Sequence, residues 1–400
     1  MHALILKLAL IPCVTAAGFY LFCIQSASSH FSRKEEGRDE KEFLPPVSVL
    51  KSICGADTGL YENLASFCRQ NYPLYEIVVG VQDPQDPAIP VVQRLMRDFP
   101  EAEIRMVLCG RRMGANPKIS NLIQIESQAR HPYLLISDSD IRVGVDYLRR
   151  VVRPMSRPEV GAVTCMCHAL GKGKVEALEG LWESTEFCPH VLAAGRLEEI
   201  RFGLGSTIAV KREALDRIGG LASIADYLTD DYLLGNRVAR AGYRVVLSDL
   251  MVEHDLSIQS FSGFVRRQIR WNRGIRICRP WGYRGLLLTY GVPAGLLVLV
   301  LSGGSIFGWS IFGAMVAARL TMAYVVGVRI LNDRSARRFL WLVPLQDFVS
   351  FALWAVSLTG NTVYWRGSRF KLTREGKLSP VTAGHANAKE PYEAAAAVTR

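Results

Sequence analysis

Two carboxylates stand two residues apart at Asp138 and Asp140, directly after the apolar run Tyr133–Ser137. Acidic side chains at the end of a strand can bind a divalent cation, Mg²⁺ or Mn²⁺, and the bound cation can neutralise a nucleotide diphosphate. An isolated Asp-Ser-Asp is more often an ordinary turn, because aspartate and serine favour turns. The metal-site interpretation therefore depends on what accompanies the motif.

A second acidic pair, Asp230 and Asp231, comes just before the amphipathic stretch Tyr232–Ala241. Aspartate in that position most often caps a helix. It can also serve as a general base, because a displacement at the anomeric carbon of a sugar needs a group that takes the proton of the acceptor hydroxyl. Two acidic clusters also fit a glycosidase, although a glycosidase explains neither the arginine motif nor the apolar ends of the chain.

Arginines gather in the segment 264–284, which holds seven of them and no acidic residue. Within it, Arg267, Arg270 and Trp271 are spaced at i, i+3 and i+4, so a helix would place all three on one face. A guanidinium group suits a diphosphate leaving group, and an indole can stack on a sugar. The simpler interpretation is a basic helix on a membrane surface. It is compatible with diphosphate binding by Arg267 and Arg270, and it fits the remaining arginines.

The elements that must position these residues alternate along the middle of the chain. Short β-branched runs followed by amphipathic stretches predict an α/β fold, a mainly parallel sheet sandwiched by helices. The predicted strands are Val47–Cys54, Ile77–Val81, Ile104–Leu108, Tyr133–Ser137, Ala162–Met166, Thr207–Val210 and Arg244–Leu247. The predicted helices are Leu60–Gln70, Pro87–Phe99, Ile119–Ala129 and Tyr232–Ala241. Ligands of such sheets bind at the carboxyl ends of the strands, which is where Asp138 and Asp140 lie.

Both ends of the chain are apolar enough to enter a membrane. Ala3–Ile24 contains one charge and is long enough to span the hydrocarbon layer. It lacks the basic start and short apolar core of a signal peptide, which favours an anchor. Leu286–Leu301, Ile306–Val328 and Phe339–Leu358 are three further candidate segments. Basic residues within 33–41 place the domain that follows the anchor in the cytoplasm.

Three C-terminal crossings would carry the basic stretch 366–377 to the opposite side of the membrane, against the positive-inside rule. Either one segment is re-entrant, which the glycines and serines of 302–305 would permit, or the tail is an exception to the rule.

The predicted organisation is an anchor (1–28), a basic linker (29–45), a cytoplasmic catalytic domain (46–260), a basic interfacial helix (261–285), C-terminal membrane segments (286–360) and a tail (361–400). The tail is predicted to be basic at first and disordered from about Ser379.

The formal net charge of +11 raises the question of a nucleic-acid partner. The excess charge lies beside the apolar segments, which suits an anionic lipid surface or a diphosphate better, so no nucleic acid is expected.

The nine cysteines form no CxxC pair, and an odd number cannot all pair internally. A zinc site or a disulfide scaffold is therefore not expected, whereas a reducing compartment is.

Taken together, these motifs resemble the ceramide glucosyltransferase family of membrane-bound nucleotide-sugar transferases, whose members carry three spaced aspartates and a final (Q/R)xxRW. The resemblance covers most of the chain, at PPVSVLK (45–51), VQDPQDPAI (81–89), GANPKISNL (114–122), SDSDIRV (137–143), DDY (230–232), RQIRW (267–271) and WRGSRFKL (365–372). It implies an A-type nucleotide-sugar transferase domain with one N-terminal and about three C-terminal membrane helices.

The resemblance also implies roles for single residues. Asp86 matches the family's first aspartate and would help to hold the donor nucleotide. Asp138 matches the second and would bind the metal and the diphosphate, and Asp231 matches the third and would be the general base. In the RQIRW motif, the arginines would face the leaving diphosphate. Lys118 would add positive charge near the donor phosphates.

Other positions bear on the metal and the acceptor. Asp140 stands where animal ceramide enzymes have a glycine, so the complete DxD is similar to that of bacterial relatives, including transferases that attach an N-acetylglucosamine unit to hopanoids. With Asp138, Asp140 would form the metal site. His190 matches a histidine of the family, although a lone histidine is more often structural. Together with Asp230 and the glycine-containing loop 203–206, it is a candidate for the acceptor side.

The expected function is an inverting transfer of glucose or N-acetylglucosamine from a UDP-sugar to a lipid hydroxyl, on the cytoplasmic face of a bacterial inner membrane rather than in the Golgi. The first alternative to a ceramide glucosyltransferase-like enzyme is a hopanoid N-acetylglucosaminyltransferase. The second is a processive polysaccharide synthase, because such enzymes share the aspartates and the arginine–tryptophan element, but three C-terminal segments are few for a transmembrane tunnel. A non-enzymatic lipid-binding or transport protein would not need Asp231.

Overall fold

The computed structural model of the chain describes residues 2–32, 42–170, 173–256, 260–365 and 368–381. Its centre is an eight-stranded sheet in the order β3-β2-β1-β4-β7-β6-β8-β5. The strands are β1 (Val47–Ile53), β2 (Tyr75–Val81), β3 (Ile104–Leu108), β4 (Tyr133–Ile136), β5 (Ile141–Arg142), β6 (Val160–Leu170), β7 (Ile208–Lys211) and β8 (Arg244–Asp255). β1 runs parallel to β2 and β4, whereas β7 runs antiparallel to β4 and β6. The mixed, mostly parallel sheet was correctly predicted, although β6 and β8 are longer than expected.

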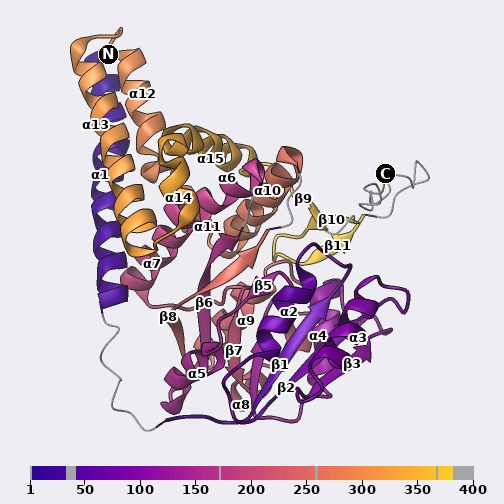
Figure 1. Cartoon of the computed structure of the whole chain (residues 1–400). Coiled ribbons are helices and arrows are strands. Elements are labelled where there is room, and N and C mark those ends of the chain that lie inside the picture. Colours follow the sequence, from indigo (N-terminus) through magenta and orange to yellow (C-terminus); the bar gives the residue numbers. More distant parts are fainter. Residues whose placement is uncertain (1, 33–41, 171–172, 257–259, 366–367, 382–400) are drawn as a thin grey trace, which may run out of the picture.

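Helices cover both faces of this sheet (Figure 1). The helices around it are α2 (Leu60–Cys68), α3 (Ala88–Asp98), α4 (Pro117–Glu126), α5 (Tyr147–Val152), α8 (Arg212–Arg217) and α9 (Asp230–Arg240). Successive residues of a strand point to opposite faces. Within β1, Val49 belongs to the apolar cluster that includes α2 and α3, and Leu50 to the cluster that includes α4 and α9. A sheet buried on both faces explains why its strands are apolar runs without alternation.

Three helices are long and apolar enough to cross a membrane, namely Leu4–Ser32, Ile306–Ile330 and Arg334–Ser357. They correspond to α1 (His2–Ser32), to α13 (Ile306–Ala323) with the π-helical turn after it, and to α14 (Arg334–Phe339) with α15 (Val343–Ser357). A fourth candidate is bent by 54° between Pro280–Thr289 and α12 (Gly291–Leu301). α1, α12 and α13 contact one another and stand together as an upright bundle in Figure 1.

α15 lies beside this bundle in Figure 1, at an angle to its long axis, and is joined to it by a buried ion pair. Arg319 Nε of α13 lies 2.8 Å from Asp347 Oδ1 of α15, and both side chains are at most 4% exposed. Ser350 of α15 also donates a hydrogen bond to Glu186, in the π-helical turn Glu183–Phe187. Because the two charges pair with each other, burying them within an apolar bundle costs less free energy. The ion pair connects α15 to the bundle, and the hydrogen bond of Ser350 connects it to the turn that holds Glu186.

The arginine run lies on α10 (Phe261–Cys278), which contacts α15. Arg276 donates hydrogen bonds to the carbonyl oxygens of Ser357 and Leu358, at 2.8 and 2.7 Å, and Arg273 donates to that of Thr359 at 3.2 Å. The last carbonyl groups of a helix have no intrahelical partners and carry partial negative charge. These two arginines, which we expected on a membrane surface, therefore cap the C-terminal end of α15.

Part of the basic tail forms a sheet that the sequence analysis missed. β9 (Thr362–Trp365), β10 (Ser368–Leu372) and β11 (Leu378–Pro380) are antiparallel. Val363, Phe370, Leu372 and Leu378 pack with Leu228 of the sheet domain. Strands of three to five residues with several charges give too weak a pattern to be recognised. The disorder predicted for the end of the chain falls almost entirely on residues outside the described part.

Candidate active site

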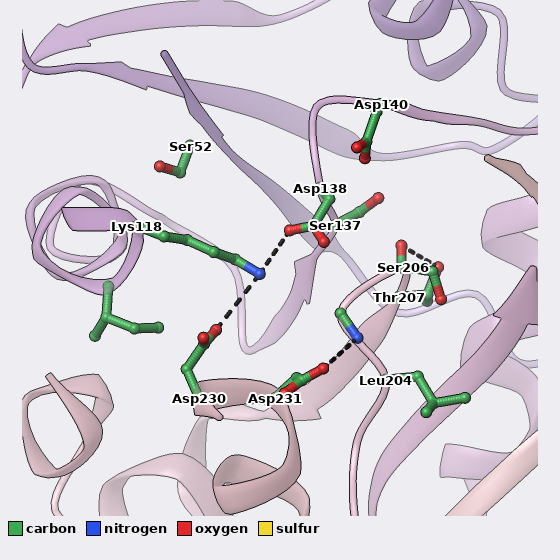
Figure 2. A network of polar contacts seen from close by, with 12 residues as sticks. Ser52, Lys118, Ser137, Asp138, Asp140, Leu204, Ser206, Thr207, Asp230 and Asp231 are labelled. Atoms are coloured by element: carbon green, nitrogen blue, oxygen red, sulfur yellow. Dashed lines mark hydrogen bonds and ion pairs between the residues drawn. The ribbon is translucent and has the colours of Figure 1, made fainter. Parts of the chain in front are cut away.

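Lys118, Asp138, Asp230 and Asp231 meet at the carboxyl edge of the sheet and are here called the acid–lysine cluster. Lys118 Nζ lies 2.5 Å from Asp138 Oδ1 and 3.4 Å from Asp230 Oδ2 (Figure 2). Asn116 caps α4, which carries the lysine in its first turn, and also donates a hydrogen bond to Asp230 at 3.2 Å. Burial alone would lower the pKa of Lys118, but the three aspartates raise it above its usual value, so the lysine is charged.

Asp231, the predicted base, lies in the first turn of α9. Its Oδ2 accepts a hydrogen bond from the N–H of Gly205 at 3.0 Å, and its Oδ1 accepts one from the next residue at 2.7 Å. A side chain at Gly205 would place its Cβ 2.9 Å from Asp138 Oδ2, so this approach requires glycine. Burial and the neighbouring Asp230 raise the pKa of Asp231 to about 6, against the opposing effect of Lys118. Such a carboxylate is ionised at neutral pH and is a stronger base than an ordinary aspartate.

A buried lysine that the sequence analysis missed supports the DSD loop. Lys51 Nζ of β1 donates hydrogen bonds to Ser137 Oγ at 3.0 Å and to the carbonyl oxygen of Asp138 at 2.8 Å. It also lies 3.6 Å from the ring centre of Phe67, and burial lowers its pKa to about 7. The available signal was a lysine inside the apolar strand VSVLKSI, since lysine is almost never buried without partners.

Asp140 interacts with a different set of residues, although it stands on the same loop as Asp138. Its Oδ2 lies 3.3 Å from His254 Nε2, and His254 Nδ1 lies 2.8 Å from Glu183 Oε1. We call Asp140, Glu183 and His254 the histidine cluster. Burial would lower the pKa of His254, but the two carboxylates raise it well above its usual value. Glu183 and His254 stand far from the DSD motif in the sequence, and no local pattern distinguishes them.

The histidine cluster has the ligand types for a divalent cation. Asp140 Oδ1 and Glu183 Oε2 are buried and, within the described residues, have no hydrogen-bond partner. Ligand atoms of Cys167, Glu183 and His254 all lie within 4.8 Å of one another. Imidazole and carboxylate suit a cation such as Mn²⁺, and a carboxylate on the second ring nitrogen commonly orients a ligating histidine. Asp140 and His254 therefore have the ligand types for a cation, which would bind in place of the proton that His254 Nε2 shares with Asp140. Asp138, predicted as the partner ligand of Asp140, lies against Lys118 instead.

The RQIRW motif lies on α10, and its arginines have different environments. Arg267 lies 3.3 Å from Glu179 of α6 (Lys174–Trp182), a carboxyl group whose pKa burial raises to about 7. Trp271 stacks on Trp182, the last residue of α6, with ring centres 5.4 Å apart. Arg270 is partly buried near the aspartates, and burial together with Arg267 lowers its pKa to about 10, so it remains charged. Arg270 is therefore the arginine of the motif that belongs with the acid–lysine cluster.

Two predicted residues lie apart from this cluster. Asp86 accepts hydrogen bonds from the N–H of Gly55, at 2.9 to 3.0 Å, and from that of Ala88, and it joins the loops after β1 and β2. The His190 ring packs on Phe19 of α1 with ring centres 5.1 Å apart, and burial lowers its pKa. In this structure His190 is a contact between the sheet domain and the N-terminal helix.

The sequence matches the model of glycosyl transferase family 21 over residues 9–378. The chain belongs to this family. A family 21 chain with this fold is a glycosyltransferase of the hexosyltransferase class. Ceramide glucosyltransferase 3 of Caenorhabditis elegans is 28% identical over 382 residues, which cover 93% of this chain and 83% of the relative. Ceramide glucosyltransferase 1 of the same organism is 26% identical over 390 residues, covering 93% and 81%. The resemblance to the ceramide glucosyltransferase family is confirmed.

The fold of this family 21 member is also found in a solved structure. The mannosyltransferase PcManGT from Pyrobaculum calidifontis, in complex with GDP-Man and Mn²⁺, superposes with a TM-score of 0.51 at 18% identity. The match covers 86% of this chain and 98% of the mannosyltransferase. At this identity the likeness concerns the fold alone, and it confirms the predicted A-type transferase architecture.

Proposed function

We propose that this family 21 enzyme transfers a hexose from a UDP-sugar to the hydroxyl group of a lipid, with inversion at the anomeric carbon. Family membership and two relatives named ceramide glucosyltransferases support this choice of donor and acceptor. The observation that carries the proposal is the partly buried Asp231, whose pKa is raised to about 6, in the same cluster as the charged Lys118. This arrangement places a general base close to a positive charge, and positive charge stabilises a diphosphate leaving group.

Asp231 acts as the general base in this proposal. The acceptor oxygen forms a bond to the anomeric carbon, and the bond from that carbon to the phosphate oxygen of UDP breaks. The acceptor proton passes to the Asp231 carboxylate. Two backbone N–H groups already bind this carboxylate, but its two oxygens offer about four acceptor positions, so it can still take the proton. A single displacement of this kind inverts the configuration.

Lys118 and Arg270 stabilise the leaving diphosphate. Both are partly buried and lie near the three aspartates of the acid–lysine cluster. Fixed positive groups in a site that excludes water stabilise developing negative charge more than they would in bulk solvent. A divalent cation held by Asp140 and His254 would add further positive charge beside the diphosphate.

The test is an assay of the purified protein in detergent with Mn²⁺ or Mg²⁺ and product detection by mass spectrometry. UDP-glucose and UDP-N-acetylglucosamine are each offered with ceramide and with a hopanoid polyol. We expect one glycolipid carrying a single hexose unit. A long polymer would instead support a processive synthase, and the absence of transfer with every pair would overturn the proposal.

We further infer that α1, α13 and the bent pair of Pro280–Thr289 with α12 cross the membrane, and that α15 lies in the headgroup region on the side of the sheet domain. The orientation of α15, at an angle to the long axis of the bundle, supports this arrangement. Trp281 and Trp341 are 78% and 72% exposed, and tryptophan prefers the interface between lipid and water. Two crossings after the sheet domain return the basic tail to the cytoplasmic side, in agreement with the positive-inside rule.

Protease treatment of sealed vesicles of both orientations tests this topology. A C-terminal epitope tag should be removed from inside-out vesicles and protected in right-side-out vesicles. Protection in inside-out vesicles would show that α15 also crosses the membrane.

A further inference from the structure

The C-terminal sheet, β9–β11, contacts the loop that delivers the two aspartates of α9. This loop comprises residues 226–229. The N–H of Leu378 donates a hydrogen bond to the carbonyl oxygen of Asp226 at 2.7 Å, and the N–H of Leu228 donates to that of Gly376 at 3.2 Å. Backbone bonds in both directions attach the loop to the edge of the C-terminal sheet.

The opposite side of the same loop is held by the GANPK segment. Asn116 donates a hydrogen bond to the carbonyl oxygen of Tyr227 at 2.8 Å, and the N–H of Ala115 donates to Asp226 Oδ1 at 2.9 Å. Tyr227 also forms an isolated antiparallel bridge with Lys377 of the tail. The loop therefore cannot move without breaking contacts on one side or the other, and the first turn of α9 follows it directly.

A tryptophan of the C-terminal sheet also contacts the catalytic arginine. The Arg270 guanidinium carbon lies 6.0 Å from the ring centre of Trp271 and 5.7 Å from that of Trp365. An arginine beside two indole rings gains cation–π stabilisation and loses alternative orientations. Trp365 thus adds an aromatic contact from the C-terminal sheet to the one that Arg270 has on its own helix.

We propose that the C-terminal sheet is part of the active-site structure and that Trp365 is a positioning residue for the transfer reaction. The sheet fixes the loop before Asp231, and Trp365 keeps Arg270 directed at the leaving diphosphate. The inference rests on the proposed function, in which Arg270 stabilises that leaving group. It gives a role to the segment WRGSRFKL, which is not a part of the central sheet.

The experiment compares Trp365→Leu, Trp365→Phe and the matched control Tyr364→Leu in the full-length enzyme. Tyr364 is the neighbouring residue of β9, its side chain is 51% exposed, and successive strand residues point to opposite faces. We expect Trp365→Leu to lower kcat about 10- to 30-fold, with less than about a twofold change in the KM of the donor. Trp365→Phe keeps an aromatic face and should restore most of the activity, and Tyr364→Leu should behave as the wild type.

Thermal unfolding in detergent and Asp231→Asn in the same assay separate the possible failures. An unchanged kcat in Trp365→Leu, with Asp231→Asn inactive, would overturn the positioning role and leave the proposed function intact. Full activity of Asp231→Asn would overturn the proposed function itself. Equal losses in Trp365→Leu and Tyr364→Leu, accompanied by a lower Tm in both, would mean that β9 matters only for stability and would also overturn the inference.

Discussion

The acid–lysine cluster and the histidine cluster begin two residues apart in the sequence but differ in how their charges are satisfied. In the first, Asp138 and Asp230 lie beside Lys118, and Asp231 accepts two backbone hydrogen bonds. In the second, two buried carboxylate oxygens have no hydrogen-bond partner in the part of the chain that the structure describes. Each carboxylate of the first cluster therefore has a partner, whereas two carboxylate oxygens of the second would gain one if a cation bound. The two aspartates of the DSD motif thus belong to different clusters.

Asp231→Asn is the strongest test of the difference between the two clusters, because it removes the proposed base and keeps the shape of the side chain. We expect transfer to fall by about 10³-fold, because an amide cannot take the acceptor proton. UDP-sugar binding, measured by calorimetry with Mn²⁺, should survive. Asp216→Asn, at an exposed carboxylate of α8, is the control and should have no effect. Loss of donor binding in Asp231→Asn would count against its assignment as the base.

Arg270→Lys should have the next largest effect, a loss of about 100-fold in kcat. A single ammonium group cannot reproduce the planar fork of a guanidinium that contacts two indoles. The matched control is Arg266→Lys, which changes another arginine of the same helix without altering RQIRW. Steady-state kinetics of both variants measure the difference. Equal kinetics for Arg270→Lys and the wild type would show that Arg270 does not stabilise the leaving group.

Glu183→Gln tests the histidine cluster. We expect the Mn²⁺ concentration for half-maximal activity to rise about 10- to 100-fold, because the neutral amide orients and polarises His254 less well than a carboxylate. Direct Mn²⁺ binding, followed by electron paramagnetic resonance, should weaken in parallel. Glu253→Gln, next to His254 on β8, is the control. Unaltered Mn²⁺ binding in Glu183→Gln would place the cation elsewhere.

The pH dependence should show the smallest effect. Asp231 must be ionised to accept a proton, and its pKa is raised to about 6. The rate should therefore fall about tenfold per pH unit below pH 6 and become level above pH 7. Single-turnover rates measured between pH 4.5 and 8 test this fall of the rate at acidic pH. A rate that is still constant at pH 5 would mean that the base has an ordinary aspartate pKa.

The central fold and the acid–lysine cluster could largely be predicted from the sequence. Apolar runs ending in Asp138 identified the strand and its functional edge, and the neighbourhood of Asp231 followed from family motifs. Parallel strands bring their carboxyl ends to one edge, so residues predicted separately meet there. Lys51 could also have been found, because a lysine within an apolar strand needs a partner.

The histidine cluster and the C-terminal sheet could not be predicted in the same way. Glu183 and His254 become neighbours of Asp140 only when the π-helical turn Glu183–Phe187 and β8 come to lie beside the DSD loop. The C-terminal sheet depends on long-range backbone pairing, such as the hydrogen bond between Leu378 and Asp226, which no local periodicity encodes. The different surroundings of Asp138 and Asp140 likewise depend on partners supplied by distant elements.

The buried pair of Arg319 and Asp347 limits how this protein can be trimmed for study in aqueous solution. A truncation that removes α15 but retains α13 would leave Arg319 as an uncompensated buried charge, at a cost of about 3–5 kcal/mol. Replacing both residues by apolar side chains of similar volume avoids that cost. A shortened form must therefore lose or change the two positions together, and the same coupling predicts that they co-vary during evolution.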